Sequence, residues 1–176
     1  MDSHHVSSPY AAKEDEMDSR RKLVSGAVIF AMAAMTVAAT AQPKDPSMGT
    51  WVLNVAKSTY NPGPASKSGT RTYTPAPNGY MFSSDGVGAT GTKSHVEFTA
   101  AFDGKYHVMT GSTTSDSIMV SRVDANTVKS TQKKGAKEVV RTTRTVSKDG
   151  KTLTSTTKGT GADGKPYTNV EVFDRK

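Results

Sequence analysis

Few side chains in this chain are of the types that perform chemistry. The sequence contains no cysteine, which excludes disulfides, thiolate metal sites and thiol nucleophiles. His95 and His107 lie on neighbouring predicted strands that are joined by a hairpin at Asp103-Gly104. In that hairpin His107 faces Ala100, and His95 lies on the other face of the sheet. The two histidines therefore cannot share a metal ion, and the sequence predicts no metal site.

Catalytic motifs are absent from the sequence as well. It has no G-x-S-x-G motif, no H-E-x-x-H motif and no carboxylates brought together by their spacing. Residues 86–91 (GVGATG) match the letters of a dinucleotide-binding loop, but a predicted strand follows where a phosphate-binding helix would be needed. We interpret this segment as a flexible connection. The sequence predicts a protein that is not an enzyme and that needs no cofactor.

Basic residues gather in one region of the chain, where only Glu138 and Asp149 oppose them. On adjacent hairpins they would form a positive flank that attracts anionic lipid or polysaccharide of a cell envelope. The region has no aromatic residues to stack on bases, which argues against nucleic acid as a partner. The other interpretation is a solvated exterior that discourages pairing between molecules. The basic residues are Lys129, Lys133, Lys134, Lys137, Arg141, Arg144, Lys148 and Lys151.

Arg144 has two alternative roles, because the phase of its strand is open. It shares a strand face with Val140, Thr142 and Val146. If that face is internal, Arg144 is a buried cation that needs an anion, such as Glu171 or an acidic ligand. If the face is external, Arg144 is one more surface charge.

Residues 17–41 have the pattern of a secretory signal peptide. A basic start at 20–22 precedes a light apolar run at 23–38, and Ala39-Thr40-Ala41 forms an A-x-A cleavage site. A membrane anchor is the alternative, since the apolar run approaches spanning length. An incomplete twin-arginine pattern ranks behind the ordinary secretory route. Residues 1–16 are either a disordered extension or a mis-assigned start.

Cleavage after Ala41 predicts a periplasmic or secreted chain that comprises residues 42–176. This part carries 19 Lys and Arg against 11 Asp and Glu, a formal charge of +8. Its length suits one compact domain at 49–176 behind a short linker at 42–48.

The exported part has a pattern of about ten short strands. Thr, Ser, Gly and Lys dominate it, which suits strands and tight turns rather than helices. Asp-Gly-Lys occurs at 103, 149 and 163, each time as a turn between alternating runs. Pro62 and Pro64 predict a loop over one end at 56–69, with no strand. The predicted strands are 49–55, 69–74, 79–84, 94–102, 106–110, 116–123, 127–133, 138–147, 151–158 and 167–174.

Such a series of strands must stack as two sheets or close on itself, because its apolar material is sparse. Hydrophobic residues make up 34% of the chain and aromatic residues only 7%. A Greek-key sandwich would need a long crossover, whereas most connections here are hairpins, and closure also removes exposed edges. The predicted fold is all-β: a single antiparallel up-and-down barrel of about 8 to 10 strands, preceded by the signal-peptide helix.

The first and last predicted strands carry residues that point to a family. Gly49-Thr50-Trp51 opens the first strand, and Val172-Phe173-Asp174-Arg175 ends the last. Together with the strand count and length, they resemble the calycin group, which comprises the lipocalins and the intracellular lipid-binding proteins. The chain is similar to small exported lipocalin-like proteins of bacteria. The resemblance implies structural roles for Gly49, Trp51 and Arg175, with Trp51 closing one end of the barrel beneath the Arg175 cation.

Two features depart from the lipid-binding branch of that group. Its members hold a ligand carboxylate with an Arg and a Tyr on the last strand, where this chain has Glu171 and Phe173. They also carry a helical lid, where this chain has only the Pro-Gly loop. The resemblance therefore does not imply fatty acid binding by the usual anchor. The phase of the last strand stays open, since alternation favours Val170 and Val172 inward and the family likeness favours Glu171 and Phe173.

The sequence predicts a monomeric barrel that binds a small apolar or amphipathic molecule in its interior. Inner walls rich in Thr and Ser, with few large side chains, would leave a partly polar cavity. The alternative function is a structural or interaction protein of the cell envelope that uses the basic flank. The predicted ligand-binding residues are Tyr73, Tyr80, Phe82, Val96, Phe98, His107, Met109, Arg144, Glu171 and Phe173.

Overall fold

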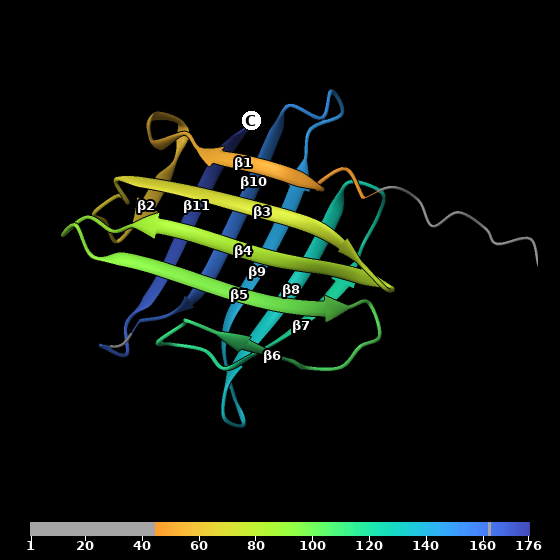
Figure 1. Ribbon diagram of the computed structural model, residues 1–176. Coiled ribbons are helices and arrows are strands. Elements are labelled where there is room, and N and C mark those ends of the chain that lie inside the picture. Colours follow the sequence, from red (N-terminus) through yellow and green to blue (C-terminus); the bar gives the residue numbers. More distant parts are fainter. Residues whose placement is uncertain (1–44, 162) are drawn as a thin grey trace, which may run out of the picture. The chain divides into compact units, whose positions relative to one another are not determined.

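The computed structural model describes residues 45–161 and 163–176, and their strands form one antiparallel sheet that closes on itself (Figure 1). The predicted extension at 1–16 and the predicted signal peptide at 17–41 lie outside the described residues. The elements are β1 (Gly49–Leu53), the 3-10 turn η1 (Val55–Lys57), β2 (Thr59–Asn61), β3 (Ser68–Ala76), β4 (Gly79–Val87), β5 (Lys93–Ala101), β6 (His107–Thr110), β7 (Ser117–Arg122), β8 (Thr127–Lys134), β9 (Lys137–Val146), β10 (Thr152–Thr160) and β11 (Pro166–Arg175).

The barrel is closed by its first and last strands. From β3 to β11 each strand pairs with the next, while β1 pairs with β3 on one side and with β11 on the other. In the closing pair Trp51 lies opposite Arg175, and Leu53 lies opposite Phe173. Strands β1 and β3 to β11 therefore form a closed wall of ten antiparallel strands. The predicted up-and-down β-barrel is confirmed.

The short strand β2, which is additional to the ten strands of the closed wall, corrects the prediction for the segment after β1. The prediction of a loop without any strand at 56–69 is wrong for β2, which pairs with β11 beyond the end of β1. The Asn54 side chain caps η1 by accepting a hydrogen bond from the Lys57 amide. The η1 turn separates β1 from β2 along the chain. Pro62 then ends the pairing, because proline has no amide hydrogen to donate.

The repeated Asp-Gly-Lys turns share one local structure. The carboxylates of Asp103, Asp149 and Asp163 accept a hydrogen bond from the lysine amide two residues later, at 3.0, 3.1 and 3.1 Å. The glycine between them has φ of 72°, 71° and 78°, a conformation that suits a residue without Cβ. Residues 86–91, which match a dinucleotide-binding motif in letters, lie at the β4–β5 hairpin, so no helix follows them.

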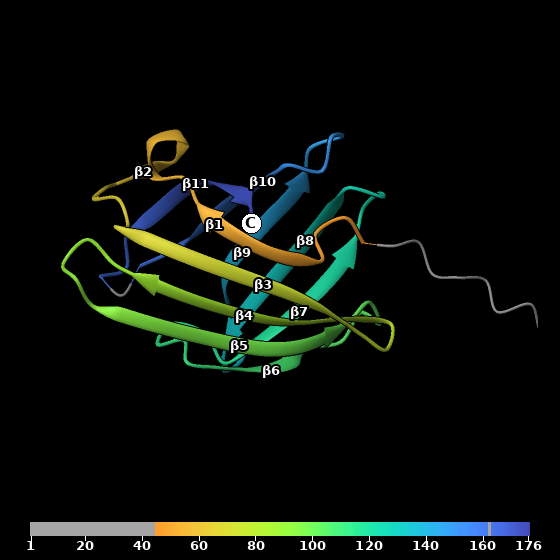
Figure 2. The same cartoon turned by 45° about the horizontal axis from the view of Figure 1, so that its top comes forward.

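The strands form two crossed layers, seen from two directions in Figures 1 and 2. Strands β3, β4 and β5 run across β8, β9 and β10, and the interior lies between them. One buried apolar cluster joins the layers: Trp51, Leu53, Tyr73, Tyr80, Ala100, Met109, Ile118, Val120, Val128, Val146, Leu153 and Phe173. Within the described residues no helix has the length and apolar character needed to cross a membrane.

Candidate ligand cavity

Residues 45–48, part of the predicted linker, pack against one end of the barrel, which we call the closed end. Trp51 is completely buried there, and its indole Nε1 donates a hydrogen bond to the Ser47 carbonyl at 2.7 Å. The Arg175 guanidinium lies 4.1 Å from the centre of the Trp51 ring and donates to the carbonyls of Pro46 and Met48. Gly49 has φ of +112°, and a Cβ there would lie 3.2 Å from the Arg175 side chain.

Arg144 points inward from β9 and reaches the closed end. It is 6% exposed, and its guanidinium carbon lies 4.2 and 4.7 Å from the ring centres of Tyr73 and Tyr80. Its Nη2 is 3.7 Å from an Asp45 carboxylate oxygen and makes no hydrogen bond within the described structure. The internal alternative for Arg144 is therefore the one observed. Its facing carboxylate is Asp45 rather than Glu171.

Asp45 connects several polar side chains at the closed end by hydrogen bonds. Its carboxylate accepts hydrogen bonds from the Ser47 amide and hydroxyl at 2.9 and 2.6 Å, and from Arg122 at 2.9 Å. Burial favours the neutral acid, but the Ser47 hydrogen bonds and the charges of Arg144 and Arg122 outweigh it and lower the pKa of Asp45. Burial also raises the pKa of Tyr80 to about 12. The carboxylate is therefore ionised and the phenol neutral at neutral pH.

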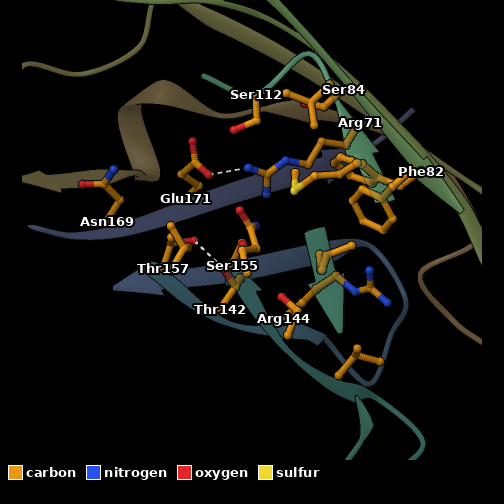
Figure 3. Close-up of a pocket in the computed structure, with 18 of the residues that line it drawn as sticks. Arg71, Phe82, Ser84, Ser112, Thr142, Arg144, Ser155, Thr157, Asn169 and Glu171 are labelled. Atoms are coloured by element: carbon orange, nitrogen blue, oxygen red, sulfur yellow. Dashed lines mark hydrogen bonds and ion pairs between the residues drawn. The ribbon is translucent and has the colours of Figure 1, made fainter. Parts of the chain in front are cut away.

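A cavity of about 260 Å³ occupies the interior (Figure 3). Its lining has two chemically different walls. Aromatic and aliphatic side chains from β3 to β7 form the first, which we call the aromatic wall: Tyr73, Tyr80, Phe82, Val96, Phe98, Met109 and Ile118. Hydroxyl and amide side chains from β8 to β11 dominate the second, which we call the polar wall: Ser130, Gln132, Thr142, Ser155, Thr157, Tyr167 and Asn169.

The aromatic wall is an apolar surface built from rings that pack on one another. The rings of Phe82 and Phe98 are stacked, with centres 4.8 Å apart and an angle of 25° between their planes. Tyr73 packs on Phe82 at 5.0 Å. On the polar wall, the hydroxyls of Thr142 and Thr157 lie 3.2 Å apart. A ligand between the walls would meet apolar side chains on one side and hydrogen-bonding groups on the other.

An ion pair spans the cavity lining. Arg71 Nη2 on β3 lies 2.5 Å from a Glu171 carboxylate oxygen on β11, and the two side chains are 18% and 16% exposed. The Tyr60 hydroxyl donates a weaker hydrogen bond to Glu171 at 3.3 Å. The Arg71 guanidinium also covers the Phe173 ring at 4.2 Å. Burial, followed by the charge of Glu171, raises the pKa of Tyr167 above its ordinary value.

The structure brings together most of the predicted ligand-binding residues. The cavity is lined by Tyr73, Tyr80, Phe82, Val96, Phe98, Met109, Arg144 and Glu171. Phe173 points inward like Glu171 but is 1% exposed beneath Arg71, so it supports the lining from behind. The last strand therefore has the phase favoured by the family likeness.

His107 corrects the prediction, because it does not line the cavity. Its Nε2 lies 3.0 Å from the Asp103 carboxylate, so the side chain is held by the turn that precedes β6. The other strand histidine, His95, is on the outer surface between Asp85 at 2.7 Å and Glu97 at 3.0 Å. Hydrogen bonds that protonated His95 donates to the Asp85 and Glu97 carboxylates raise the pKa of His95. Among the described residues no cluster of three or more acidic or histidine side chains could hold a metal ion.

The basic flank is weaker than the sequence suggested. Arg144 is internal and does not contribute to it. Arg141 is paired with Glu138, and Lys133 lies 3.9 Å from the centre of the Tyr106 ring. Arg141 and Lys133 thus already have partners within the chain.

Comparisons with known proteins give a likeness of fold alone. No protein family model matches the chain, and no curated protein matches it. Among solved structures it is similar to the zebrafish ileal bile acid-binding protein complexed with cholic acid, with a TM-score of 0.46 and 14% identity over 74% of this chain and 99% of that chain. The number of strands in the barrel and its closure agree with the prediction from the alternating runs and hairpin turns.

Proposed function

We propose that this protein binds a small amphipathic molecule inside its barrel. The observation that carries the proposal is the cavity of about 260 Å³ between the aromatic wall and the polar wall. A cavity with apolar rings and a few placed polar groups is the usual form of a small-molecule site. The arrangement fits a ligand with one apolar and one hydrogen-bonding side.

The proposal applies to the exported chain that cleavage after Ala41 would produce. Residues 45–48, which are held on the closed end by hydrogen bonds of Asp45, Ser47 and Trp51, would then lie near the start of that chain. Ligand exchange would occur at the opposite end, where Ser112 and Thr114 line the cavity. The alternative function, binding of envelope anions by the basic flank, has less support because Arg144, Arg141 and Lys133 are engaged elsewhere.

Native mass spectrometry tests the proposal on protein purified without detergent. We expect a discrete small molecule to co-purify and to be released on denaturation. Thr142→Phe should abolish its retention, because position 142 faces the cavity and a phenyl ring there would fill it. Thr143→Phe is the matched control, since the next residue of β9 faces outward. Equal retention by both variants would place the molecule outside the barrel and contradict the proposal.

A further inference from the structure

Each arginine that lines the cavity already faces a carboxylate of the chain. Three charged residues line the cavity: Arg71, Arg144 and Glu171. Arg71 is paired with Glu171 at 2.5 Å. Arg144 faces Asp45 at 3.7 Å, and Asp45 also binds Arg122 at 2.9 Å. An acidic ligand would therefore have to compete with a carboxylate of the chain at either arginine.

Arg144 is also poorly placed to receive a ligand acid. Its side chain is 7% exposed, and the rings of Tyr73 and Tyr80 lie against its guanidinium. Figure 3 shows the guanidinium directed away from Glu171 and from the middle of the lining. A carboxylate that reached it would enter the surroundings of Asp45, where two like charges would be buried together.

Arg71 is more exposed than Arg144, but its guanidinium already forms an ion pair with Glu171. A ligand carboxylate beside Arg71 would lie close to the Glu171 carboxylate, and repulsion between them would oppose binding. Taking an unpaired carboxylate out of water is itself unfavourable. The cavity therefore disfavours acids at both of its arginines.

Uncharged hydrogen-bonding groups are favoured in the same place. The polar wall presents hydroxyls of Ser130, Thr142 and Thr157 and amides of Gln132 and Asn169. Hydroxyl and amide groups can each donate and accept hydrogen bonds, so they match the hydroxyls of a polyol. The side chains of the aromatic wall supply an apolar surface for the rest of the ligand.

We propose that the cavity selects an uncharged, polyhydroxylated amphiphile, of which a glycoside is the simplest example, over carboxylic acids. This inference rests on the proposed function, since it names the chemical class of the ligand of that cavity. The apolar part lies on the aromatic wall, and the hydroxyls lie on the polar wall and on the Arg71–Glu171 pair.

Two ligands that differ at one carbon test the inference by isothermal titration calorimetry. Phenyl β-D-glucopyranoside carries a hydroxymethyl group where phenyl β-D-glucuronide carries a carboxylate. We expect the purified protein to bind the glucoside at least tenfold more tightly, equivalent to about 1.4 kcal/mol. Octanoate serves as a simple amphipathic acid and should bind at least tenfold more weakly than the glucoside.

A single substitution should reverse the preference. Glu171→Gln removes the carboxylate and leaves Arg71 without its anion. We expect the glucuronide to bind at least tenfold more tightly to this variant than to the unmodified protein, so that the variant no longer prefers the glucoside. Glu138→Gln is the matched control, because it removes an equivalent ion-pair partner on the outer surface and should alter neither affinity.

The outcomes separate the inference from the function on which it rests. Equal or tighter binding of the glucuronide or octanoate by the unmodified protein overturns the neutral-ligand inference and leaves cavity binding intact. Failure of all three compounds to bind overturns both. If Glu171→Gln does not fold, the double variant Arg71→Met/Glu171→Met gives a cavity without this pair. It should still prefer the glucoside, and loss of that preference counts against the inference.

Discussion

Two arginine–carboxylate pairs face the interior of this barrel, and their surroundings differ. At the closed end, Arg144 and Asp45 have side chains 7% and 8% exposed and lie among aromatic rings and hydrogen-bond donors. In the cavity lining, Arg71 and Glu171 are 18% and 16% exposed and border open space. The first pair is placed to stabilise the fold, and the second is placed to set the charge that a ligand meets.

The difference extends to the aromatic residues around each pair. Trp51 is fully buried, with its indole nitrogen bonded and its ring covered by Arg175. Phe82 and Phe98 are only partly buried, and both side chains line the cavity. A barrel can leave such apolar surface exposed inside because the packed end supplies the stability. Substitutions at the two ends should therefore separate folding from binding.

The largest expected effect is at Trp51. Trp51→Ala removes the largest side chain of the packed end, and we expect it to lower the free energy of unfolding by about 3–5 kcal/mol. Phe82→Ala should cost less, about 1–2 kcal/mol, because part of that ring already borders the cavity. Urea denaturation followed by far-UV circular dichroism measures both, since Trp51 is the only tryptophan. A larger loss at Phe82 would contradict the division between the two ends.

A smaller effect, with a distinct pH dependence, is expected at Asp45. Asp45→Asn should lower the free energy of unfolding at pH 7 by about 2 kcal/mol, because the charged hydrogen bond to Arg122 is weakened and Arg144 loses its facing carboxylate. The pKa of Asp45 is lower in the folded than in the unfolded chain. Its ionised form therefore stabilises the fold above about pH 4, and this contribution disappears as the pH falls through the folded-state pKa.

Urea midpoints at pH 7 and pH 3 test this expectation. The difference between the unmodified protein and Asp45→Asn should shrink on acidification. Asp163→Asn provides the control, because Asp163 lies in an exposed turn and an asparagine oxygen can still accept the Lys165 amide. A difference at position 45 that is the same at both pH values would mean that the Asp45 charge does not stabilise the closed end.

The fold could be predicted from the sequence because strand periodicity and turn chemistry are local. The alternation of apolar and polar residues predicted that Phe98 and Met109 point inward. The Asp-Gly-Lys repeats predicted three of the hairpin turns. Strand β2 was missed because its pairing partner is on β11, far along the chain. Asp45 was placed in a linker for the same reason, since its partners Arg122 and Arg144 are distant in sequence.

The polar half of the cavity was harder to predict than the aromatic half. On β9 and β10, Thr142 and Thr157 face inward while Thr143 and Thr156 face outward, so polarity does not reveal the phase. Arg71 was also missed, although it is two residues from Tyr73 and therefore on the same strand face. That spacing could have indicated an inward-facing Arg71 with a carboxylate partner inside the barrel, because a buried cation needs an anion.

The smallest expected effect compares the two arginines directly by the same substitution. Arg144→Lys should lower the free energy of unfolding by about 1 kcal/mol, because an ammonium cannot stack on Tyr73 and Tyr80 as a guanidinium does. Arg71→Lys should cost less, since lysine keeps the charge beside Glu171 in a more solvated site. Binding of phenyl β-D-glucopyranoside should follow the opposite order, with the larger loss at Arg71. If both variants lose stability and binding in the same proportion, the interior works as one unit and the closed end is not separate from the cavity.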